Sequence, residues 1–268
     1  MVNPIISIII PSLNQGEFLE HALQSILTQG YKHFELIIID GGSTDKTLKI
    51  IQSYNTDSRI KWISEPDKGQ SDALNKGFQM TQGDIIGWLN TDDLYLSGCF
   101  QTIARFFEEH DDIDIVYGDY CLINREGKII KYRKEINFDL FILKYLHVLY
   151  IPSTSTFFRR KIIEENYLLR IDYHYAMDYD FFLRLALAGY KFAHFKQYLA
   201  NFRWHENSKS ATATSRQFAE REMSLLEQDR LINNIHPILL RKTIRGVFMV
   251  FARLKRTTLK IIQGCYKL

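Results

Sequence analysis

Two adjacent aspartates, Asp92 and Asp93, follow the apolar segment 85–89 after Asn90 and Thr91. Side chains at the carboxyl end of a strand lie where open α/β sheets bind ligands. Neighbouring carboxylates repel each other and are rarely buried without a partner, and their hard oxygens suit Mg²⁺ or Mn²⁺. Because Mg²⁺ is usually held by one or two carboxylates together with substrate phosphates, the segment predicts a metal–phosphate site. Taken alone, the pair is equally compatible with a solvated turn.

A second acidic segment, 40–45, ends another apolar run and precedes a helical pattern. Its two glycines allow positive φ and a close backbone approach. Asp40 is then an acceptor at a strand end, suited to a nucleobase N–H or a ribose hydroxyl, and the alternative is a tight turn with a helix cap. The sequence has neither the dinucleotide-binding glycine pattern nor a P-loop, so these two kinds of site are disfavoured.

Two more polar segments lead into helices. In the loop 65–77, Lys68 can meet a phosphate as a point charge and Asp72 can lie at the helix N-terminus. Capping and solvated charge are the alternative there. Asp178 and Asp180 begin an apolar helix, where negative charge is favoured, so one of them can be only a cap while the other acts as a general base.

Arg203 and His205 follow a predicted strand in the last third of the chain. His205 can be a third metal ligand or a hydrogen-bond donor to a diphosphate, and Arg203 can pair with a phosphate. A histidine after a strand is also often structural. With a metal–phosphate site in the same chain, a base such as Asp178 is what transfer to a hydroxyl requires.

The elements that must position these residues differ between the two halves of the chain. In the first half, the predicted strands are 5–10, 35–39, 60–64 and 84–89, and the predicted helices are 17–28, 46–54 and 71–80. This alternation of continuous apolar runs with amphipathic stretches predicts an α/β fold with a mainly parallel sheet and helices on both faces. The second half is predicted to contain helix 98–110, strand 113–117, a hairpin through 124–127, an aromatic-rich stretch 138–158, helix 179–188, a strand pair in 191–204, and helices 216–233 and 239–262.

The composition narrows the class of protein. Apolar residues make up 46% of the 268 residues and charged residues 24%, as in ordinary globular proteins. The net charge of +3 is too small to argue for a nucleic-acid partner. Cys99, Cys121 and Cys265 lie far apart, which disfavours a zinc site or a disulfide framework and fits a reducing compartment. The sequence shows neither a signal-peptide pattern nor an apolar run of membrane-spanning length, so a cytoplasmic location is expected.

Together these segments resemble the family 2 glycosyltransferases with a GT-A fold. The resemblance is carried by the segments 7–14, 38–45, 72–77, 89–93 and 177–180 and by His205. Each motif is modestly specific, but their order and spacing match that family from residue 7 to residue 205. The resemblance implies a GT-A-type α/β domain with a C-terminal helical extension.

The resemblance also implies roles for particular residues in an inverting single displacement from a nucleotide-diphosphate sugar. Asp92 would hold Mn²⁺ or Mg²⁺ at the diphosphate, Asp178 would deprotonate the acceptor hydroxyl, and His205 would support the diphosphate or its metal. The expected nucleotide-sugar contacts, among which Asp40 would meet the base, are Pro11, Asn14, Asp40, Lys68, Asp72, Asn90, Thr91, Asp92 and Arg203. The expected metal ligands are Asp92, Asp93 and His205.

Three positions depart from the family pattern. Gly41 stands where many relatives have a second Asp or Asn, so fewer base contacts are expected. Asn90 replaces the first aspartate of the usual DxD motif, and Met177 replaces a frequent glutamate before the catalytic aspartate. The chain has no QxxRW motif and no apolar run of spanning length, which disfavours a processive polysaccharide synthase.

The C-terminal segment is basic and amphipathic. The sequence divides into a glycosyltransferase domain, 1–235, with a nucleotide-binding half 1–95 and an acceptor-binding half 96–235, and a helical tail, 236–268. In this tail, Arg245, Arg253, Arg256 and Lys260 are predicted to share one helical face, and the opposite face is predicted to contain Ile244, Val247, Phe248, Phe251, Leu254, Leu259 and Ile262. Such a helix can lie on an anionic membrane, where each cation adds about 1 kcal/mol, or it can pack on the domain or a second subunit.

The sequence therefore predicts a metal-dependent glycosyltransferase of surface-polysaccharide or glycolipid assembly. A UDP-sugar is the favoured donor, and the acceptor is a glycan or a lipid-linked sugar. A catalytically silent nucleotide-sugar-binding scaffold on the same fold is the alternative, left open by Asn90. A nucleotidyltransferase is disfavoured, because residues 11–17 supply no Gly- and Arg/Lys-rich triphosphate loop. A homodimer and peripheral membrane contact through the tail are compatible with the sequence.

Overall fold

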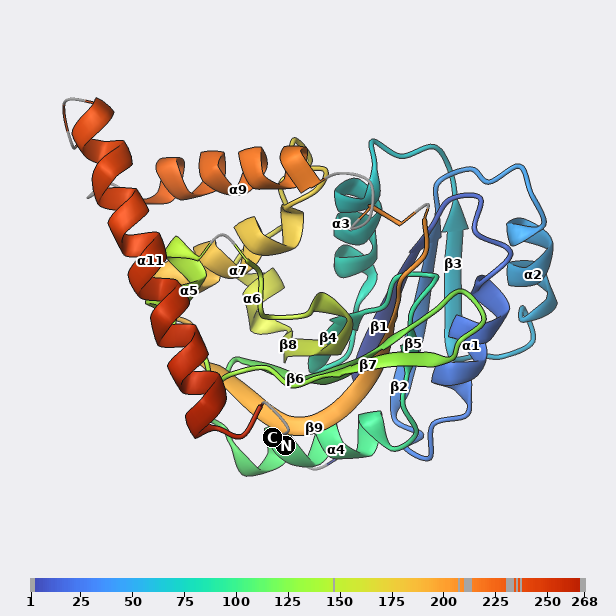
Figure 1. Cartoon of the computed structure of the whole chain (residues 1–268). Helices are drawn as coiled ribbons and strands as arrows, with labels where there is room; N and C mark the ends of the chain where they lie inside the picture. The colour runs from blue at the N-terminus through green and yellow to red at the C-terminus, as the bar shows by residue number, and fades with distance from the viewer. Residues whose placement is uncertain are drawn as a thin grey trace.

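The computed structural model describes residues 3–146, 148–206, 208–209, 214–229, 234, 236 and 238–265. The strands are β1 (Ile6–Ser12), β2 (Phe34–Asp40), β3 (Ile60–Ser64), β4 (Ile85–Trp88), β5 (Leu94–Tyr95), β6 (Ile115–Ile123), β7 (Ile129–Arg133), β8 (Thr156–Arg159) and β9 (Phe192–Arg203). The helices are α1 (Leu19–Leu27), α2 (Thr47–Ser53), α3 (Gln70–Met80), α4 (Cys99–Glu109), α5 (Leu140–Tyr145), the 3₁₀ turn η1 (Ser153–Ser155), α6 (Lys161–Glu164), α7 (Met177–Leu187), α9 (Thr214–Gln228) and α11 (Ile238–Ile262). The strands form one sheet in the order β3-β2-β1-β4-β8-β6-β9-β5, with β7 paired to β6 (Figure 1).

The N-terminal side of the sheet is parallel, as the sequence predicts. β1 pairs in parallel with both β2 and β4, and β2 pairs in parallel with β3. Each predicted strand and helix of this half is present, with ends that differ by at most two residues. Side chains alternate between the two faces: Ile9 and Ile37 pack with α3 and α7, whereas Ile8 and Ile38 pack with α1 and α4. Burial on both faces explains why these strands are continuous apolar runs.

The C-terminal side is mixed, and one prediction for it is wrong. Instead of a strand pair in 191–204, residues Phe192–Arg203 form the single strand β9, which pairs in parallel with β6 and antiparallel with β5. Its register shifts beside Asp119, and this shift accommodates Lys196 and Gln197, the polar residues that interrupt the apolar pattern. β8 pairs antiparallel with β4 and β6, and the predicted hairpin connects β6 to β7. The fold is thus an α/β fold with α4 on one side of the sheet and α5, α7 and α9 on the other (Figure 1).

The C-terminal helix α11 packs on the domain, against α5, and ion pairs hold it there. These pairs join Arg245 to Glu222, Lys255 to Asp139, and both Arg256 and Lys260 to Glu135, at N–O distances of 2.6, 2.5, 2.9 and 3.5 Å. The prediction of a basic face opposite the apolar one is therefore wrong for Arg245, Arg256 and Lys260, because acidic groups of the domain draw these cations inward. Residues 230–233 of the predicted helix 216–233 lie outside the described residues.

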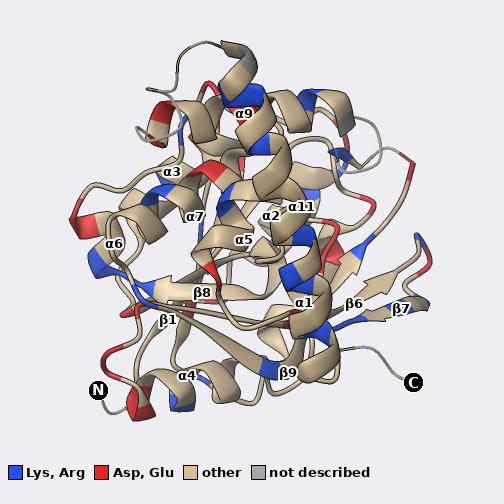
Figure 2. Cartoon of the chain, turned by 60° about the vertical axis from the view of Figure 1, so that its left-hand side comes forward, with Lys and Arg blue, Asp and Glu red and all other residues tan. Residues whose placement is uncertain are grey.

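Apolar side chains lie on both sides of α11. Phe248 packs inward, with its ring 4.9 Å from that of Tyr145, and Ala252 is fully buried. The outer side exposes Val247, Val250, Phe251, Leu254, Ile261 and Ile262. Lys and Arg recur along the helix, and it contains no Asp or Glu (Figure 2). Among the described helices, none is both long and apolar enough to cross a membrane.

Candidate active site

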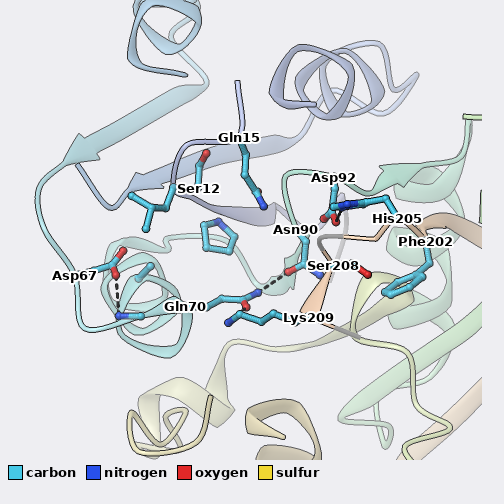
Figure 3. A pocket seen from close by; sticks show the side chains of 14 residues that line it. Ser12, Gln15, Asp67, Gln70, Asn90, Asp92, Phe202, His205, Ser208 and Lys209 are labelled. Atoms are coloured by element: carbon cyan, nitrogen blue, oxygen red, sulfur yellow. Dashed lines mark hydrogen bonds and ion pairs between the residues drawn. The ribbon is translucent and has the colours of Figure 1, made fainter. Parts of the chain in front are cut away.

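A pocket of about 400 Å³ opens at the carboxyl ends of β1, β3 and β4 (Figure 3). This is the edge at which open α/β sheets bind ligands. Its lining consists of Pro11, Ser12, Leu13, Gln15, Asp67, Gly69, Gln70, Ala73, Asn90, Asp92, Phe202, His205, Ser208 and Lys209. We call it the strand-end pocket. Of the residues predicted from the sequence, it brings together Pro11, Asn90, Asp92 and His205.

Asp92 and His205 form the polar centre of the strand-end pocket. The Nε2 atom of His205 lies 3.1 Å from Oδ2 of Asp92, and both side chains are mostly buried. Asn90 lies beside them and accepts a hydrogen bond from Gln70 Nε2 at 2.7 Å, as Figure 3 shows. The segments that follow two strands far apart in the sequence thus meet here, because Asp92 follows β4 and His205 follows β9.

Asp93 is fully buried and does not line the strand-end pocket. Its carboxylate accepts hydrogen bonds from Thr154 Oγ1 at 2.6 Å, from the Arg203 backbone N–H at 2.9 Å and from Asn90 Nδ2 at 3.2 Å. Burial, reinforced by the nearby charge of Asp92, raises the pKa of Asp93 well above its usual range. The structure therefore places Asp93 where it ties the loop after β4 to η1 and β9, apart from the other predicted metal ligands.

Asp40 is also fully buried, and its acceptor sites are used within the protein. The carboxylate accepts hydrogen bonds from the backbone N–H groups of Gly42 and Ser43 at 3.2 and 3.0 Å, from the Ser43 hydroxyl, and from Ser64 Oγ at 2.6 Å. It does not line the strand-end pocket. The structure thus gives Asp40 the contacts of the tight-turn alternative, with Ser64 of β3 as an additional donor.

Asn14 and Thr91 hold loops together beside the pocket. Asn14 Oδ1 accepts a hydrogen bond from the Thr44 N–H at 2.8 Å, and the Asn14 N–H donates to Ser43 Oγ at 2.7 Å. The Thr91 hydroxyl, which is fully buried, donates to the carbonyl of Pro11 at 2.8 Å. These bonds join the loop after β1 to the loops after β2 and β4, so both residues shape the pocket without lining it.

The remaining predicted nucleotide-sugar contacts, Lys68, Asp72 and Arg203, do not line the strand-end pocket. Lys68 is exposed, and the backbone N–H of Lys68 donates a hydrogen bond to the carboxylate of Asp72 at 3.1 Å. Arg203 is buried, and its guanidinium donates to the carbonyls of Asp92, Asn124 and Arg125 at 2.8, 3.0 and 2.6 Å. Burial lowers the pKa of Arg203. Its contacts fix the Asp92 loop against the β6–β7 hairpin.

Among the pocket residues that were not singled out from the sequence, three have polar side chains that bear on ligand binding: Asp67, Gln70 and Lys209. A Cβ atom built on Gly41 would lie 2.5 Å from Asp67 Oδ2, so the Asp67 carboxylate fills the space beside Gly41. Lys209 Nζ donates to Gln70 Oε1 at 2.9 Å, and burial lowers the pKa of Lys209. Asp67 and Gln70 were detectable in principle, because they follow the predicted strand 60–64 just as Asp92 follows 84–89.

A second pocket, of about 510 Å³, adjoins the first, because Phe202 lines both. We call it the hairpin pocket. It is lined by Tyr120, Leu122, Ile130, Arg133, Glu135, Leu149, Tyr150, Ile151, Pro152, Ser153, Thr154, Asp178, Phe202, Trp204, Gln217 and Arg221. Asp178, near the start of α7, is its one predicted catalytic residue. Burial raises the pKa of Asp178, and the positive charge of Arg221 partly opposes this shift.

Glu220 of α9 holds the beginning of α7 in place. Its carboxylate accepts backbone hydrogen bonds from His174, Tyr175 and Ala176 at 3.2, 2.7 and 2.8 Å. Ala176, the residue that precedes α7, has no side chain that could cap the helix. Unpaired N–H groups at a helix start favour an anionic acceptor, so Glu220 acts as a cap supplied from a distant helix. It positions the turn that contains Asp178.

The donor atoms in the strand-end pocket suit a divalent cation shared with a bound phosphate. The described residues contain no cluster of three His, Cys, Asp or Glu side chains able to hold a metal ion. Asp92, Asn90 and His205 nevertheless offer carboxylate, amide and imidazole donors on one wall. Mg²⁺ commonly takes one or two carboxylates and completes its shell with substrate phosphates and water, and Mn²⁺ accepts the same hard ligands. The residues present therefore fit a metal that binds together with a diphosphate.

Comparison of sequences identifies relatives over most of the chain. The family model described as glycosyl transferase family 2 matches residues 7–167. A PGL/p-HBAD biosynthesis glycosyltransferase of Mycobacterium bovis is 34% identical over 187 residues, covering 69% of this chain and 70% of the relative. An uncharacterized glycosyltransferase of Rickettsia typhi is 30% identical over 220 residues, covering 79% and 67%.

Comparison of structures shows the same fold in more distant proteins. S. aureus TarS 1–349 in complex with UDP-GlcNAc matches with a TM-score of 0.70 and 18% identity, over 91% of this chain and 70% of that one. A mannosyltransferase from Pyrobaculum calidifontis in complex with GDP-Man and Mn²⁺ matches with a TM-score of 0.65 and 16% identity, over 99% and 76%. At these identities the likeness shows a GT-A-type fold.

Proposed function

This chain belongs to glycosyl transferase family 2, and from this premise we propose that it transfers a sugar from a nucleotide-diphosphate donor to an acceptor hydroxyl by inversion. The observation that carries the proposal is the pair of adjoining pockets, with Asp92 in one and Asp178 in the other. A donor in the strand-end pocket and an acceptor in the hairpin pocket would meet at Phe202. Asp92 would then lie beside the donor and Asp178 beside the acceptor. A silent scaffold would need neither acid.

The strand-end pocket would bind the donor. Asp92, with Asn90 and His205, would hold Mn²⁺ or Mg²⁺ against the diphosphate, and the metal would stabilise negative charge on the leaving group. Lys209, which lines the same pocket, would add a positive charge. Two structural relatives were solved with UDP-GlcNAc and with GDP-Man, so both uracil and guanine donors need testing. Asp93 and Arg203, which do not line the pocket, would hold the loop that contains Asp92 in place.

Asp67 is a better candidate for nucleobase recognition than Asp40. The Asp67 carboxylate lines the strand-end pocket, whereas all the contacts of Asp40 lie within its own loop and β3. Gly41 leaves the space that the Asp67 side chain occupies. We therefore assign to Asp67 the acceptor role for a base N–H that the sequence suggested for Asp40.

Asp178 would act as the general base in the hairpin pocket. The acceptor O–H proton would pass to its carboxylate while the acceptor oxygen forms a bond to the anomeric carbon. The bond from that carbon to the phosphate oxygen breaks at the same time, and the nucleoside diphosphate leaves. Because burial raises the pKa of Asp178, its carboxylate is a stronger base than an exposed aspartate.

The outer side of α11 is proposed to rest on an anionic membrane surface, which would suit a glycolipid acceptor. It exposes Phe251 and Leu254 at 59% and 60%, and the same helix also exposes the cations Lys242 and Arg253. Because α11 contains no acidic residue, two copies would repel each other, whereas anionic lipid would attract both.

Co-sedimentation with anionic vesicles tests the membrane surface. Wild-type protein should sediment with vesicles, and the double variant Phe251→Ser, Leu254→Ser should lose most of this binding. Thr258→Ser, an exposed change on the same helix, is the control. Equal binding of wild type and double variant, or a dimer that the double variant abolishes, would overturn this part of the proposal.

A thermal-shift panel of nucleoside diphosphates and their sugars, with and without Mn²⁺, tests the function itself. A ligand at about 100 times its Kd adds roughly 2.7 kcal/mol to the free energy of unfolding, a shift of several degrees in Tm. We expect a Mn²⁺-dependent shift with one nucleotide, absent in Asp92→Ala. A shift without any release of nucleoside diphosphate from the donor would favour the silent scaffold. No shift with any nucleotide would contradict both.

A further inference from the structure

The hairpin pocket contains a cation that no group in the described structure neutralises. Arg133 ends β7 and lines this pocket, and its Nε atom is buried without a hydrogen-bond partner. Its side chain makes no ion pair with any described residue. The nearby acid Glu135 is already paired with Arg256 at 2.9 Å and with Lys260 at 3.5 Å. Arg133 is thus a wall cation without an acidic partner among the described residues, whereas the charge of Arg221, the other arginine of this wall, acts on Asp178.

The guanidinium groups of other buried or half-buried arginines in this protein have ion-pair or hydrogen-bond partners. Arg245 pairs with Glu222 at 2.6 Å, and Arg184 pairs with Asp180 at 2.8 Å. Arg203, which has no acidic partner, donates instead to three carbonyls. Arg133 is half-buried and has neither an ion pair nor a carbonyl acceptor among the described residues, and its buried Nε atom has lost water without gaining a partner, which is costly. At a pocket wall the cost is recovered when a ligand supplies an anion, and arginine is the side chain best shaped to bind a phosphate.

The rest of the hairpin pocket is suited to a ring. Trp204 is 46% exposed at this pocket, beside Phe202 and Ile130. Aromatic side chains give a flat apolar surface on which a sugar ring can stack, while a few polar groups fix its orientation. Asp178 lies in the same pocket and can receive a hydroxyl hydrogen bond. The wall therefore offers a cation, an aromatic surface and a base to one ligand.

We propose that the hairpin pocket binds a phosphorylated acceptor sugar, with the ring against Trp204, the reacting hydroxyl at Asp178 and the phosphate on Arg133. This inference rests on the proposed function, because it takes Asp178 as the base. The same chemistry describes a soluble sugar phosphate and the sugar phosphate of a lipid-linked precursor. The reaction that supplies this substrate must then attach a phosphate to a sugar, or a sugar phosphate to a lipid.

Calorimetric titration of the full chain tests the proposal. The donor pocket is first saturated with Mn²⁺ and the nucleoside diphosphate found by the thermal-shift panel, so that phosphate probes cannot bind there. The probes are glucose, glucose 1-phosphate and the octyl phosphodiester of glucose. Glucose 1-phosphate should bind at least about tenfold more tightly than glucose, as expected for hydrogen bonds to a charged group.

Substitutions assign that preference to one residue. Arg133→Gln should abolish the preference for glucose 1-phosphate over glucose, whereas Arg133→Lys, which retains the charge, should keep part of it. Lys131→Gln removes an exposed cation of the same strand that does not line the pocket, and it should keep the full preference. Partial loss of folded protein lowers the number of sites for both ligands and leaves the ratio of their affinities unchanged, and retained nucleotide binding shows that the Arg133→Gln variant is folded.

The outcomes separate the possible ligands and the two proposals. If the octyl phosphodiester binds much more tightly than glucose 1-phosphate, the phosphate belongs to a lipid-linked acceptor, and equal binding indicates a soluble one. The inference is overturned if Arg133→Gln keeps the preference for glucose 1-phosphate over glucose, or if the wild type shows no such preference. If the protein still binds a nucleotide in these cases, the proposed function stands. Failure to bind any nucleotide would instead refute the proposed function.

Discussion

The two adjoining pockets are built in different ways. The strand-end pocket takes Pro11, Asp67 and Asn90 from loops that directly follow β1, β3 and β4, and hydrogen bonds join its polar groups to one another. The hairpin pocket combines β6, β7, β9, the segment 149–154, α7 and α9, and the Nε atom of its Arg133 has no hydrogen-bond partner among the described residues. The difference indicates that the proposed donor site follows from the topology of the sheet, whereas the proposed acceptor site depends on packing between distant elements.

Asp178→Asn should have the largest effect, and it should act on the hairpin pocket alone. Loss of a general base typically lowers kcat by about 10²–10⁴-fold. Because Asp178 does not line the strand-end pocket, nucleotide affinity should stay within about twofold of wild type. Release of nucleoside diphosphate during transfer gives kcat, and calorimetry gives the affinity. Normal turnover in this variant would exclude Asp178 as the base.

Asp92→Asn should show the opposite pattern. Loss of a metal-binding carboxylate should weaken nucleotide binding in Mn²⁺ by about 100-fold, equivalent to roughly 2.7 kcal/mol, and should remove the dependence on the metal. Asp93→Ala should leave two buried donors and the half-buried Asn90 amide without their acceptor and should lower the free energy of unfolding by about 2–3 kcal/mol. Denaturant titration measures the second effect. Unchanged metal dependence in Asp92→Asn would contradict the assignment.

Variants of Asp67 and Asp40 test which of these two carboxylates binds the nucleobase of the donor. Asp67→Ala should weaken nucleotide binding by about tenfold with little change in Tm. Asp40→Ala should lower the free energy of unfolding by about 2–3 kcal/mol, because its carboxylate joins β2 to Ser64 and to its own loop. Calorimetry and thermal unfolding of both variants separate these effects. A reversal of the two results would return the base-recognition role to Asp40.

Glu220→Ala should have a smaller effect, confined to the hairpin pocket. Removal of the anionic cap should cost about 1–2 kcal/mol of stability and should lower kcat by disturbing the turn before Asp178. Glu222→Ala, on the same helix, breaks the ion pair with Arg245 and is the matched control. It should leave kcat near the wild-type value. If both variants lower kcat equally, the position of Asp178 depends on α9 as a whole and not on the cap formed by Glu220.

The smallest expected effect is a shift in the acid limb of the pH–rate profile, which reports the protonation of Asp178. The base acts in its deprotonated form, and burial raises the pKa of Asp178. Activity should therefore fall on acidification at a pH above the usual range of an aspartate, which is about 4. Measurement of kcat/KM between about pH 4 and pH 8 locates this limb. The limb should be absent from the residual activity of Asp178→Asn, and its persistence there would assign it to another group.

The family and the strand ends could be predicted from the sequence because both depend on local patterns. The apolar runs of β1 to β4 and the acidic residues after them are readable in the chain, and Asp92 lies in the predicted pocket. The roles of Asp93 and Arg203 could not be read in this way. Their environments are set by Thr154 and by the carbonyls of Asn124 and Arg125, which are separated from them by 61 to 79 positions in the sequence.

The sequence by itself determined an α/β chain with carboxylates at strand ends, because apolar periodicity and strand termini are properties of neighbouring residues. Only the tertiary structure decided which carboxylates face a ligand. Asp40 and Asp93 turn inward, because donors brought close by folding satisfy them, whereas Asp92, Asp67 and Asp178 line the pockets. Asp40 and Asp93 each accept three or more hydrogen bonds from the described residues, whereas Asp92, Asp67 and Asp178 accept fewer and retain acceptor capacity for a ligand.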